Sequence, residues 1–290
     1  MEAMSPQSTG VPAADPSLLP AAAEIAELRR VAERVAGEAA AHLRTLPAPR
    51  ETGEVATKST PTDVVTASDR AVEELVRARL AELRPGEPVF GEEAAGDAAA
   101  ARWVVDPIDG TVNYLYGLPW FAVSVAAVVD GVSVAGAVVE PVSGRVWSAA
   151  AGQGATCDGV RLRVTDETDL SLALVGCGFA YDATRRARQA AMIGRLLPRV
   201  RDLRRNGSAA LELCGVAAGR ADAFVEHGLG WWDWAAAALI AAEAGARVVA
   251  VSGRAGEHAA DLGGEITVVA TPGVADALVA ALRDAGAATV

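Results

Sequence analysis

The sequence predicts an α+β half, in which helices pack on an antiparallel sheet, followed by an α/β half. In the first, apolar runs at Phe121–Val129 and Val132–Val139 flank Asp130-Gly131, a dipeptide that favours the tight turn of an antiparallel hairpin. After about residue 165, short apolar strands alternate with helical patterns, which is typical of an α/β unit with a largely parallel sheet. The predicted divisions are a disordered tail at residues 1–18, an α+β half at 19–165 and an α/β half at 166–290.

Two amphipathic helices are expected to open the first half. Between Leu19 and Leu46 apolar residues recur every three or four positions, as they do on the buried face of a helix. A polar loop at 47–61 follows, and Ser68 can cap a second helix at Asp69–Leu83. The further strands expected in this half are Trp103–Val105, the two hairpin strands and Arg145–Ala149.

The second half is expected to contribute four strands and four helices. The strands are predicted at Leu172–Gly176, Ala223–Val225, Arg247–Val251 and Ile266–Ala270. The helices are predicted at Thr184–Leu197, Ser208–Gly219, Asp233–Ala244 and Val274–Ala285.

Composition and charge argue against several classes of protein. The 290 residues carry a net charge of −11, and the basic residues form only short pairs such as Arg204-Arg205, so no nucleic-acid partner is expected. No apolar run is long enough to span a membrane, and the first residues lack an apolar signal segment. The three cysteines form no CxxC motif and the three histidines form no zinc set. We expect a cytoplasmic protein without a membrane partner.

The most informative segment is Asp106-Pro107-Ile108-Asp109-Gly110-Thr111, which directly follows an apolar strand. Its two carboxylates offer oxygen ligands for a hard cation such as Mg²⁺. Gly110 permits a close backbone approach, and a helix that begins after it would point N–H groups at an anion. One loop would then bind both a cation and a phosphate, which is what phosphoryl transfer requires. An ordinary Asp-rich turn is the alternative.

Two other segments carry acids in unusual settings. Gly91-Glu92-Glu93 places two acids at a turn after an apolar pair. Trp231-Trp232-Asp233-Trp234 puts one carboxylate among indoles at the start of an Ala-rich helix. An ordinary helix N-cap is the alternative for Asp233. A carboxylate shielded by three indoles nevertheless favours a cation as its partner.

Together these segments resemble the inositol monophosphatase family, a lithium-sensitive, metal-dependent phosphatase family. The resemblance runs from about residue 20 to the C-terminus, with Tyr114 where the family often has Phe and Ala246 in place of a Gly. It implies a layered α/β/α/β/α sandwich, a homodimer and two or three Mg²⁺ ions per site. The matching segments are Lys58–Thr66 with Asp69, Gly91-Glu92-Glu93, Trp103–Tyr114, Trp232–Ala236 and Glu243-Ala244-Gly245.

The resemblance also implies roles for single residues. The implied metal ligands are Glu92, Asp106, the Ile108 carbonyl, Asp109 and Asp233. The implied catalytic groups are Asp69 and Thr111, which would orient the attacking water, and Glu92, which would assist them. The implied substrate contacts are Asp109, Gly110, Thr111, Gly207, Ser208, Ala209, Glu226 and Asp233. Lys58 and Asp63 match loop residues near the water and a weaker third ion.

The expected reaction is Mg²⁺-dependent hydrolysis of a small phosphate monoester, with myo-inositol 1-phosphate giving inositol and phosphate and with some inhibition by lithium. Glu226 precedes Asp233 by seven residues and could accept hydrogen bonds from two vicinal hydroxyls, although a solvated Glu at a strand end is the alternative. Histidinol phosphate, fructose 1,6-bisphosphate and nucleotide 3′-phosphates are alternative substrates for the same scaffold. A mainly regulatory binding role is the alternative from another class.

Overall fold

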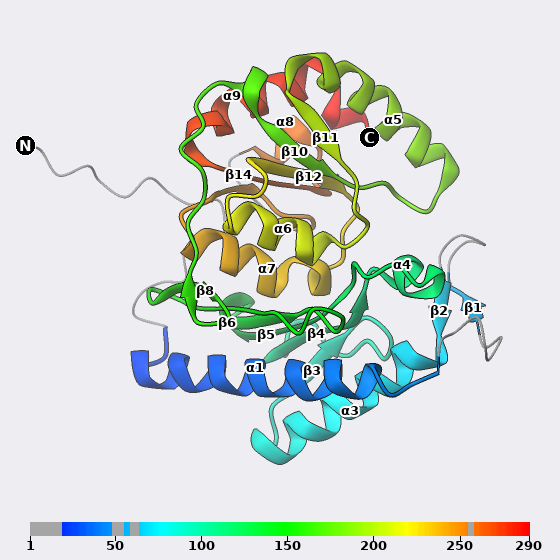
Figure 1. Cartoon of the computed structure of the whole chain (residues 1–290), viewed down its shortest axis with the longest axis vertical. Coiled ribbons are helices and arrows are strands. Elements are labelled where there is room, and N and C mark those ends of the chain that lie inside the picture. The colour runs from blue at the N-terminus through cyan, green and yellow to red at the C-terminus, as the bar shows by residue number, and fades with distance from the viewer. Residues whose placement is uncertain (1–18, 48–54, 59–63, 255–257) are drawn as a thin grey trace, which may run out of the picture.

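The computed structural model describes residues 19–47, 55–58, 64–254 and 258–290, and these residues form five layers (Figure 1). From the bottom to the top of Figure 1 the layers are two helices, a seven-stranded sheet, two helices, a five-stranded sheet and further helices. The predicted layered α/β/α/β/α sandwich is therefore confirmed. The predicted tail lies outside the described residues, and the division near residue 165 stays a prediction.

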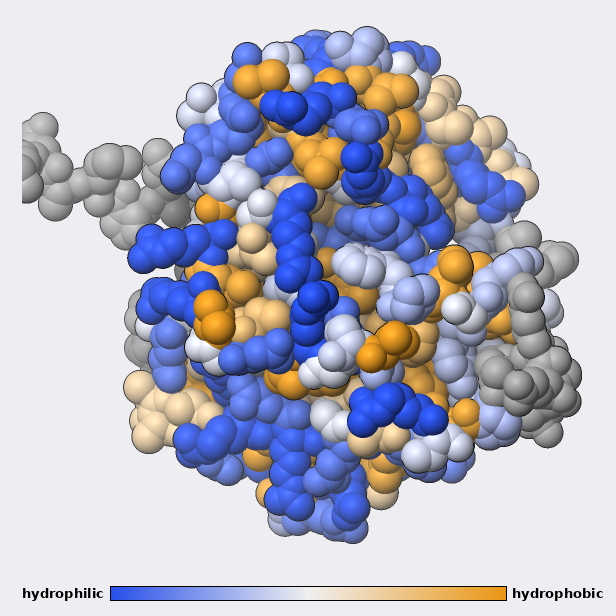
Figure 2. All heavy atoms as spheres, viewed as in Figure 1, coloured by the Kyte–Doolittle hydropathy of each residue, from blue (hydrophilic) through white to orange (hydrophobic). Residues whose placement is uncertain are grey.

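Helices α1 (Ala22–Leu43) and α3 (Ala67–Leu83) form the first layer. Apolar side chains of α1 at intervals of three and four, from Ile25 to Leu43, are buried against strands β5 and β6, as the sequence pattern predicts. Hydrophilic residues cover much of the outer surface of this layer in Figure 2. The layer is thus held by one apolar face of each helix.

The start of α3 differs from the prediction. The N-cap is Thr66, whose extended backbone (φ −110°, ψ 166°) suits a cap, and Ser68 lies inside the first turn. Thr66 and Asp69 bind each other's backbone N–H groups in a capping box. The predicted loop at 47–61 contains β1 (Val55–Thr57), which pairs antiparallel with β2 (Val64–Thr66).

The seven-stranded sheet has the order β3-β4-β5-β6-β7-β8-β9, and all its pairs are antiparallel except β3 with β4. The predicted hairpin joins β5 to β6, and its turn residues Asp130 and Gly131 both have positive φ, as this turn type requires. The strands are β3 (Val89–Gly91), β4 (Trp103–Asp109), β5 (Ala122–Val129), β6 (Val132–Val139), β7 (Val146–Ala150), β8 (Gly154–Cys157) and β9 (Val160–Arg161).

The middle layer consists of α6 (Ala209–Ala217) and α7 (Trp231–Glu243), which are buried between the two sheets. Their many alanines allow close packing: a Cβ added at Gly136 of β6 would lie 2.9 Å from the Cβ of Ala236. Because both helices begin beside β4, the layer brings their first turns to the end of that strand (Figure 1).

The five-stranded sheet has the order β11-β10-β12-β14-β13, with β10 parallel to β11 and β12. Strand β14 runs antiparallel to both of its neighbours, so the expectation of a largely parallel sheet is wrong. Among the described residues between β13 and β14, the only helix is the four-residue α8 (Ala259–Leu262), whereas a parallel crossover usually contains a full helix. The strands are β10 (Leu174–Cys177), β11 (Asp202–Arg204), β12 (Ala223–His227), β13 (Arg247–Ala250) and β14 (Ile266–Ala270).

The outer layer covers the second sheet with apolar faces of its helices. Among the described residues, none of the helices has the length and apolar character needed to cross a membrane. The remaining elements are the helices α4 (Thr111–Tyr116), α5 (Ala183–Leu196), α8 (Ala259–Leu262) and α9 (Pro272–Asp284) and the 3₁₀ turns η1 (Leu170–Leu172), η2 (Leu197–Arg199) and η3 (Ala287–Thr289).

Candidate functional site

Strand β4 carries the two central carboxylates to one side of the sheet. The strand is buried along its length and continues to Asp109, three residues beyond the predicted end. Asp106 pairs with Ser124 and Asp109 with Ala122, so β4 has one more residue than β5 between these pairs. Residues three apart on a regular strand point to opposite faces, and this bulge reverses the alternation. It therefore places both carboxylates together.

The two carboxylates differ in their hydrogen bonds. Asp109 accepts hydrogen bonds from the Ser208 hydroxyl and from the N–H groups of Ala209 (3.2 Å) and Ala210 (2.8 Å) at the start of α6. Asp106 Oδ1 accepts one from the Ile108 N–H (3.0 Å), and its buried Oδ2 has no partner among the described residues. One carboxylate oxygen thus remains available to a ligand.

A third carboxylate reaches the same point from the other half of the chain. Asp233 occupies the third position of α7, where its Oδ2 accepts a hydrogen bond from the Gly230 N–H (2.6 Å), so it is not the N-cap residue. Asp106, Asp109 and Asp233 each place one oxygen within 4.8 Å of the others. The structure therefore unites three acids that lie up to 127 positions apart in the sequence.

The electrostatics of this cluster favour a bound cation. Burial raises the pKa of Asp109 to about 6. Burial raises the pKa of Asp106 well above its ordinary value, and the charges of Glu92, Asp109 and Asp233 raise it further. Buried acids that repel one another are stabilised by a hard cation with oxygen ligands. The unpartnered Asp106 oxygen and the all-oxygen donor set both fit a Mg²⁺ site.

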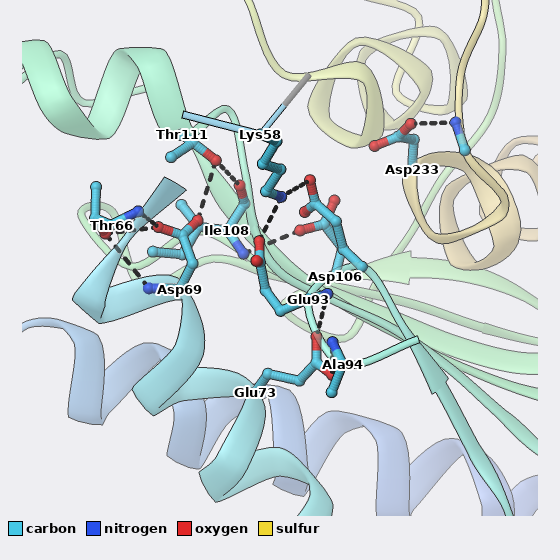
Figure 3. Close-up of polar contacts among 12 residues, drawn as sticks. Lys58, Thr66, Asp69, Glu73, Glu93, Ala94, Asp106, Ile108, Thr111 and Asp233 are labelled. Atoms are coloured by element: carbon cyan, nitrogen blue, oxygen red, sulfur yellow. Dashed lines mark hydrogen bonds and ion pairs between the residues drawn. The ribbon is translucent and has the colours of Figure 1, made fainter. Parts of the chain in front are cut away.

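Glu92 lies beside this cluster and is paired with a lysine. Lys58 Nζ is 2.7 Å from Glu92 Oε1 and 2.5 Å from Glu93 Oε1 (Figure 3). Burial raises the pKa of Glu92 to about 7, against the opposing effect of Lys58. Burial alone would lower the pKa of Lys58, but the two glutamates raise it above its ordinary value. Asp63, predicted beside Lys58, lies outside the described residues.

Asp69 and Thr111 form a hydrogen-bonded pair at the edge of the site. Thr111 Oγ1 lies 3.1 Å from Asp69 Oδ1 and 3.0 Å from the Ile108 carbonyl oxygen (Figure 3). Asp69 Oδ2 accepts hydrogen bonds from the Thr66 N–H (2.8 Å) and hydroxyl (2.6 Å). Burial raises the pKa of Asp69 despite these bonds. The carboxylate is thus fixed while one of its oxygens faces the threonine hydroxyl.

Gly110 provides the backbone conformation for this corner. Its φ of 97° is in the left-handed region, and it precedes α4 as the N-cap residue. A Cβ at this position would lie 3.1 Å from the Gly207 carbonyl oxygen, so the loop from the second half packs directly on it. The predicted short helix after Gly110 is confirmed.

The acids open onto a cavity of about 520 Å³. All the predicted metal ligands and substrate contacts line it, whereas Asp69 reaches it through Thr111. Glu226 also lines the cavity, packed against the backbone of Gly178, and burial raises its pKa to about 8. The predicted substrate residues that line the cavity are Asp109, Gly110, Thr111, Gly207, Ser208, Ala209, Glu226 and Asp233.

Sequence reasoning missed several residues of the cavity wall. Arg205 lines the cavity beside Gly207, and Glu212 lies one helical turn after Ser208, with a pKa that burial raises to about 7. The four-residue spacing from Ser208 could have indicated Glu212. Cys177 also lines the cavity, but burial raises its pKa to about 11, so its thiol is a poor nucleophile.

Known proteins are similar to this chain in sequence and in architecture. The sequence profile of the inositol monophosphatase family matches residues 24–287. Inositol-1-monophosphatase of Mycobacterium leprae (strain TN) is 54% identical over 276 residues, which are 89% of this chain and 94% of that protein. Nus factor SuhB of Escherichia coli (strain K12) is 38% identical over 226 residues, 77% of this chain and 83% of that protein. Among solved structures, Mycobacterium tuberculosis SuhB aligns with a TM-score of 0.75 and 46% identity, over 91% of this chain and 98% of that chain.

Proposed function

The chain belongs to the inositol monophosphatase family and is a phosphoric monoester hydrolase, and on that premise we propose that it hydrolyses myo-inositol 1-phosphate with Mg²⁺ as its cofactor. The observation that carries this proposal is the convergence of Asp106, Asp109 and Asp233 beside the cavity. A cluster of acids from both halves has no evident structural use, because burial of repelling charges destabilises a fold.

Glu92, Asp106, Asp109, Asp233 and the Ile108 carbonyl would hold two or three Mg²⁺ ions. Bound Mg²⁺ would supply positive charge that stabilises the phosphate oxygens and makes water more acidic. The number of ions follows from the family resemblance. Lithium inhibition is expected for the same reason.

Asp69 and Thr111 would position the attacking water. When the Thr111 hydroxyl donates its proton to Asp69, its lone pairs can accept a hydrogen bond from water. The raised pKa of Asp69 suits a group that takes up a proton during attack. As the water oxygen bonds to phosphorus, the ester bond breaks, and the proton released by the water passes in turn to the leaving oxygen, which gives inositol and phosphate.

The second half would determine the substrate specificity, that is, which alcohol the phosphate is esterified to. Glu226 could accept hydrogen bonds from two vicinal hydroxyls, and Gly207, Ser208 and Ala209, which line the same cavity, would also contact inositol hydroxyls, as the family resemblance implies. Histidinol phosphate is the alternative substrate that the same carboxylate could attract through charge. Fructose 1,6-bisphosphate is a further alternative, since the cavity also holds Arg205.

A regulatory binding role is a second candidate, favoured by the name of one relative, Nus factor SuhB. The complete set of acids at the cavity argues for catalysis as the main function. If the biological effect persists in Asp106→Asn, the binding role is favoured. We also propose a cytoplasmic homodimer, on the family resemblance and on the three cysteines, none of which is paired with another.

Phosphate release from a panel of esters tests the proposal. The panel is inositol 1-phosphate, histidinol phosphate, fructose 1,6-bisphosphate and a nucleotide 3′-phosphate, each with Mg²⁺, with EDTA and with added Li⁺. We expect inositol 1-phosphate to give the highest kcat/KM, with loss of turnover in EDTA. A higher kcat/KM for histidinol phosphate would contradict the substrate assignment. Turnover in EDTA would contradict the proposed requirement for Mg²⁺.

A further inference from the structure

We propose that Glu73 and Arg77 of α3 are positioning residues that fix the turn carrying Glu92 and thereby set the Mg²⁺ affinity of the site. This inference rests on the proposed metal-dependent function but concerns residues outside the acidic cluster. Neither residue lines the cavity formed by the described residues. Each acts on the site through the backbone of the turn at residues 91–95.

The spacing along α3 directs these residues to the site. Asp69, Glu73 and Arg77 follow one another at intervals of four, so they lie on one face of the helix. Asp69, in the first turn, holds Thr111. Glu73 and Arg77 continue the same face by one and two further turns, toward β3 and the turn that follows it.

Glu73 uses both carboxylate oxygens to hold the turn. Its Oε2 accepts a hydrogen bond from the Glu93 N–H (2.8 Å), and its Oε1 accepts one from the Ala94 N–H (3.0 Å). Figure 3 shows Glu73 reaching the turn from below, with Lys58 on the opposite side. The side chain is 2% exposed, and Arg77 Nε, 2.8 Å away, neutralises its charge.

Arg77 holds the two ends of the same segment. One terminal nitrogen donates to the Val89 carbonyl (3.0 Å) in β3, and the other donates to the Ala95 carbonyl (2.8 Å) after the turn. Together with Glu73, it attaches the beginning, middle and end of the segment 89–95 to one rigid helix. This accounts for a partly buried ion pair that the proposed chemistry itself does not use.

Gly91 gives independent support. A Cβ added at this position would lie 2.5 Å from Glu73 Oε1, so the carboxylate occupies the space that a side chain would need. The glycine of the Gly91-Glu92-Glu93 motif is thus matched to Glu73 and not to a left-handed turn, since Gly91 is absent from the positive-φ positions. The motif and the helix face form one unit.

The unit matters because Glu92 lies on the turn that Glu73 and Arg77 attach to α3. A metal ligand on a mobile turn loses conformational freedom when it binds, whereas a ligand on a fixed turn has already lost it. Outer groups that orient ligands commonly change metal affinity by roughly 10–100-fold.

Calorimetric titration of metal-free protein with MgCl₂ tests the inference in Glu73→Gln. The glutamine keeps the shape but turns an NH₂ group toward donors, so the turn loses at least one hydrogen bond. We expect the Kd for Mg²⁺ to rise at least tenfold, consistent with the range above. At saturating Mg²⁺, we expect activity to recover, with an unchanged KM for inositol 1-phosphate.

Glu74→Gln is the matched control. Glu74 is the next residue of the same helix and is exposed, and its substitution removes the same charge. It should bind Mg²⁺ within twofold of the wild type. Arg77→Met is a second variant, since its partly exposed side chain tolerates substitution more readily, and we expect a severalfold rise in Kd.

The outcomes separate the two proposals. Wild-type protein that does not bind Mg²⁺ would contradict the proposed function. Wild-type binding with Kd unchanged in both Glu73→Gln and Arg77→Met would overturn the positioning role. A lower melting temperature with an unchanged Kd would show that the ion pair is merely structural, and it would overturn the inference in the same way.

Discussion

The two halves of the molecule hold their functional groups in different ways. In the first half, side chains of other residues fix two of these groups: Thr66 fixes Asp69, and Glu73 and Arg77 fix the turn that carries Glu92. In the second half, Asp233 has one backbone hydrogen bond, from Gly230, and Glu226 has no side-chain hydrogen bond to any described residue.

This difference indicates a division of labour. A catalytic metal site needs ligands held in place before the metal arrives, and the first half provides them. A carboxylate without a protein partner is available to substrate hydroxyls, and Glu226 in the second half meets that condition. We infer that the first half determines the chemistry and the second half determines the acceptor, so substitutions in the two halves should differ in kind.

The largest effect is expected for Asp106→Asn in the first half. Loss of the central carboxylate should lower kcat/KM for every substrate by on the order of 10³-fold, the scale on which single electrostatic groups contribute to catalysis. In EDTA the same variant should melt at a higher temperature than the wild type, because it removes a buried charge that repels Glu92, Asp109 and Asp233.

Asp166→Asn serves as the control, because Asp166 is an exposed acid on the segment that joins the sheets. It should change neither activity nor melting temperature. Phosphate release and thermal unfolding measure the two quantities. If Asp106→Asn melted at a lower temperature than the wild type in EDTA, the carboxylate would stabilise the fold without metal. That result would contradict the proposal that the acids of the first half serve the chemistry.

A smaller and selective effect is expected for Glu226→Gln in the second half. The amide accepts through only one oxygen, so kcat/KM for inositol 1-phosphate should fall by roughly tenfold to a hundredfold, as for loss of a charged hydrogen bond. The kcat/KM for p-nitrophenyl phosphate should change by less than about threefold, because this ester has no vicinal hydroxyls that Glu226 could bind. Equal losses on both esters would remove the distinction between the halves.

The sequence predicted local features well because their causes are local. The turn at Asp130-Gly131 and the apolar stripe of α1 depend on neighbouring residues, and both are confirmed. The acids of the proposed metal site were identified because the segments that carry them, such as Asp106–Thr111, resemble those of a known family. Their convergence with Asp233 follows from packing of α7 on the first sheet, which no local pattern contains.

Features that depend on pairing between distant segments were missed. The direction of β14 is set by its neighbours β12 and β13, and alternation of helices and strands leaves that direction open. Glu73 is an ordinary helical acid in the sequence, and only the position of the 91–95 turn reveals its use. The bulge in β4 likewise depends on pairing with β5.

The last expected effect concerns pH and stability instead of catalysis, and it isolates Glu226 in the cavity of the second half. In the metal-free protein, burial raises the pKa of Glu226 from 4.5 to about 8, with contributions from Asp109 and Glu212. Between these values the folded state binds a proton that the unfolded chain has released. The free energy of unfolding should therefore fall as pH rises, by up to about 1.4 kcal/mol per pH unit from this group.

Glu226→Gln removes this dependence, because glutamine does not titrate. Near pH 5 the two proteins should be almost equally stable, since the wild-type glutamic acid is then protonated and resembles the amide. Near pH 8.5 the variant should be the more stable protein, because the wild type then carries a buried charge. Urea unfolding in EDTA at pH 5, 7 and 8.5 gives the difference directly, with the other titrating groups common to both proteins. A difference in stability that stays constant with pH would show that Glu226 is well solvated. Glu226 would then not be the buried carboxylate without a partner on which the proposed substrate specificity depends.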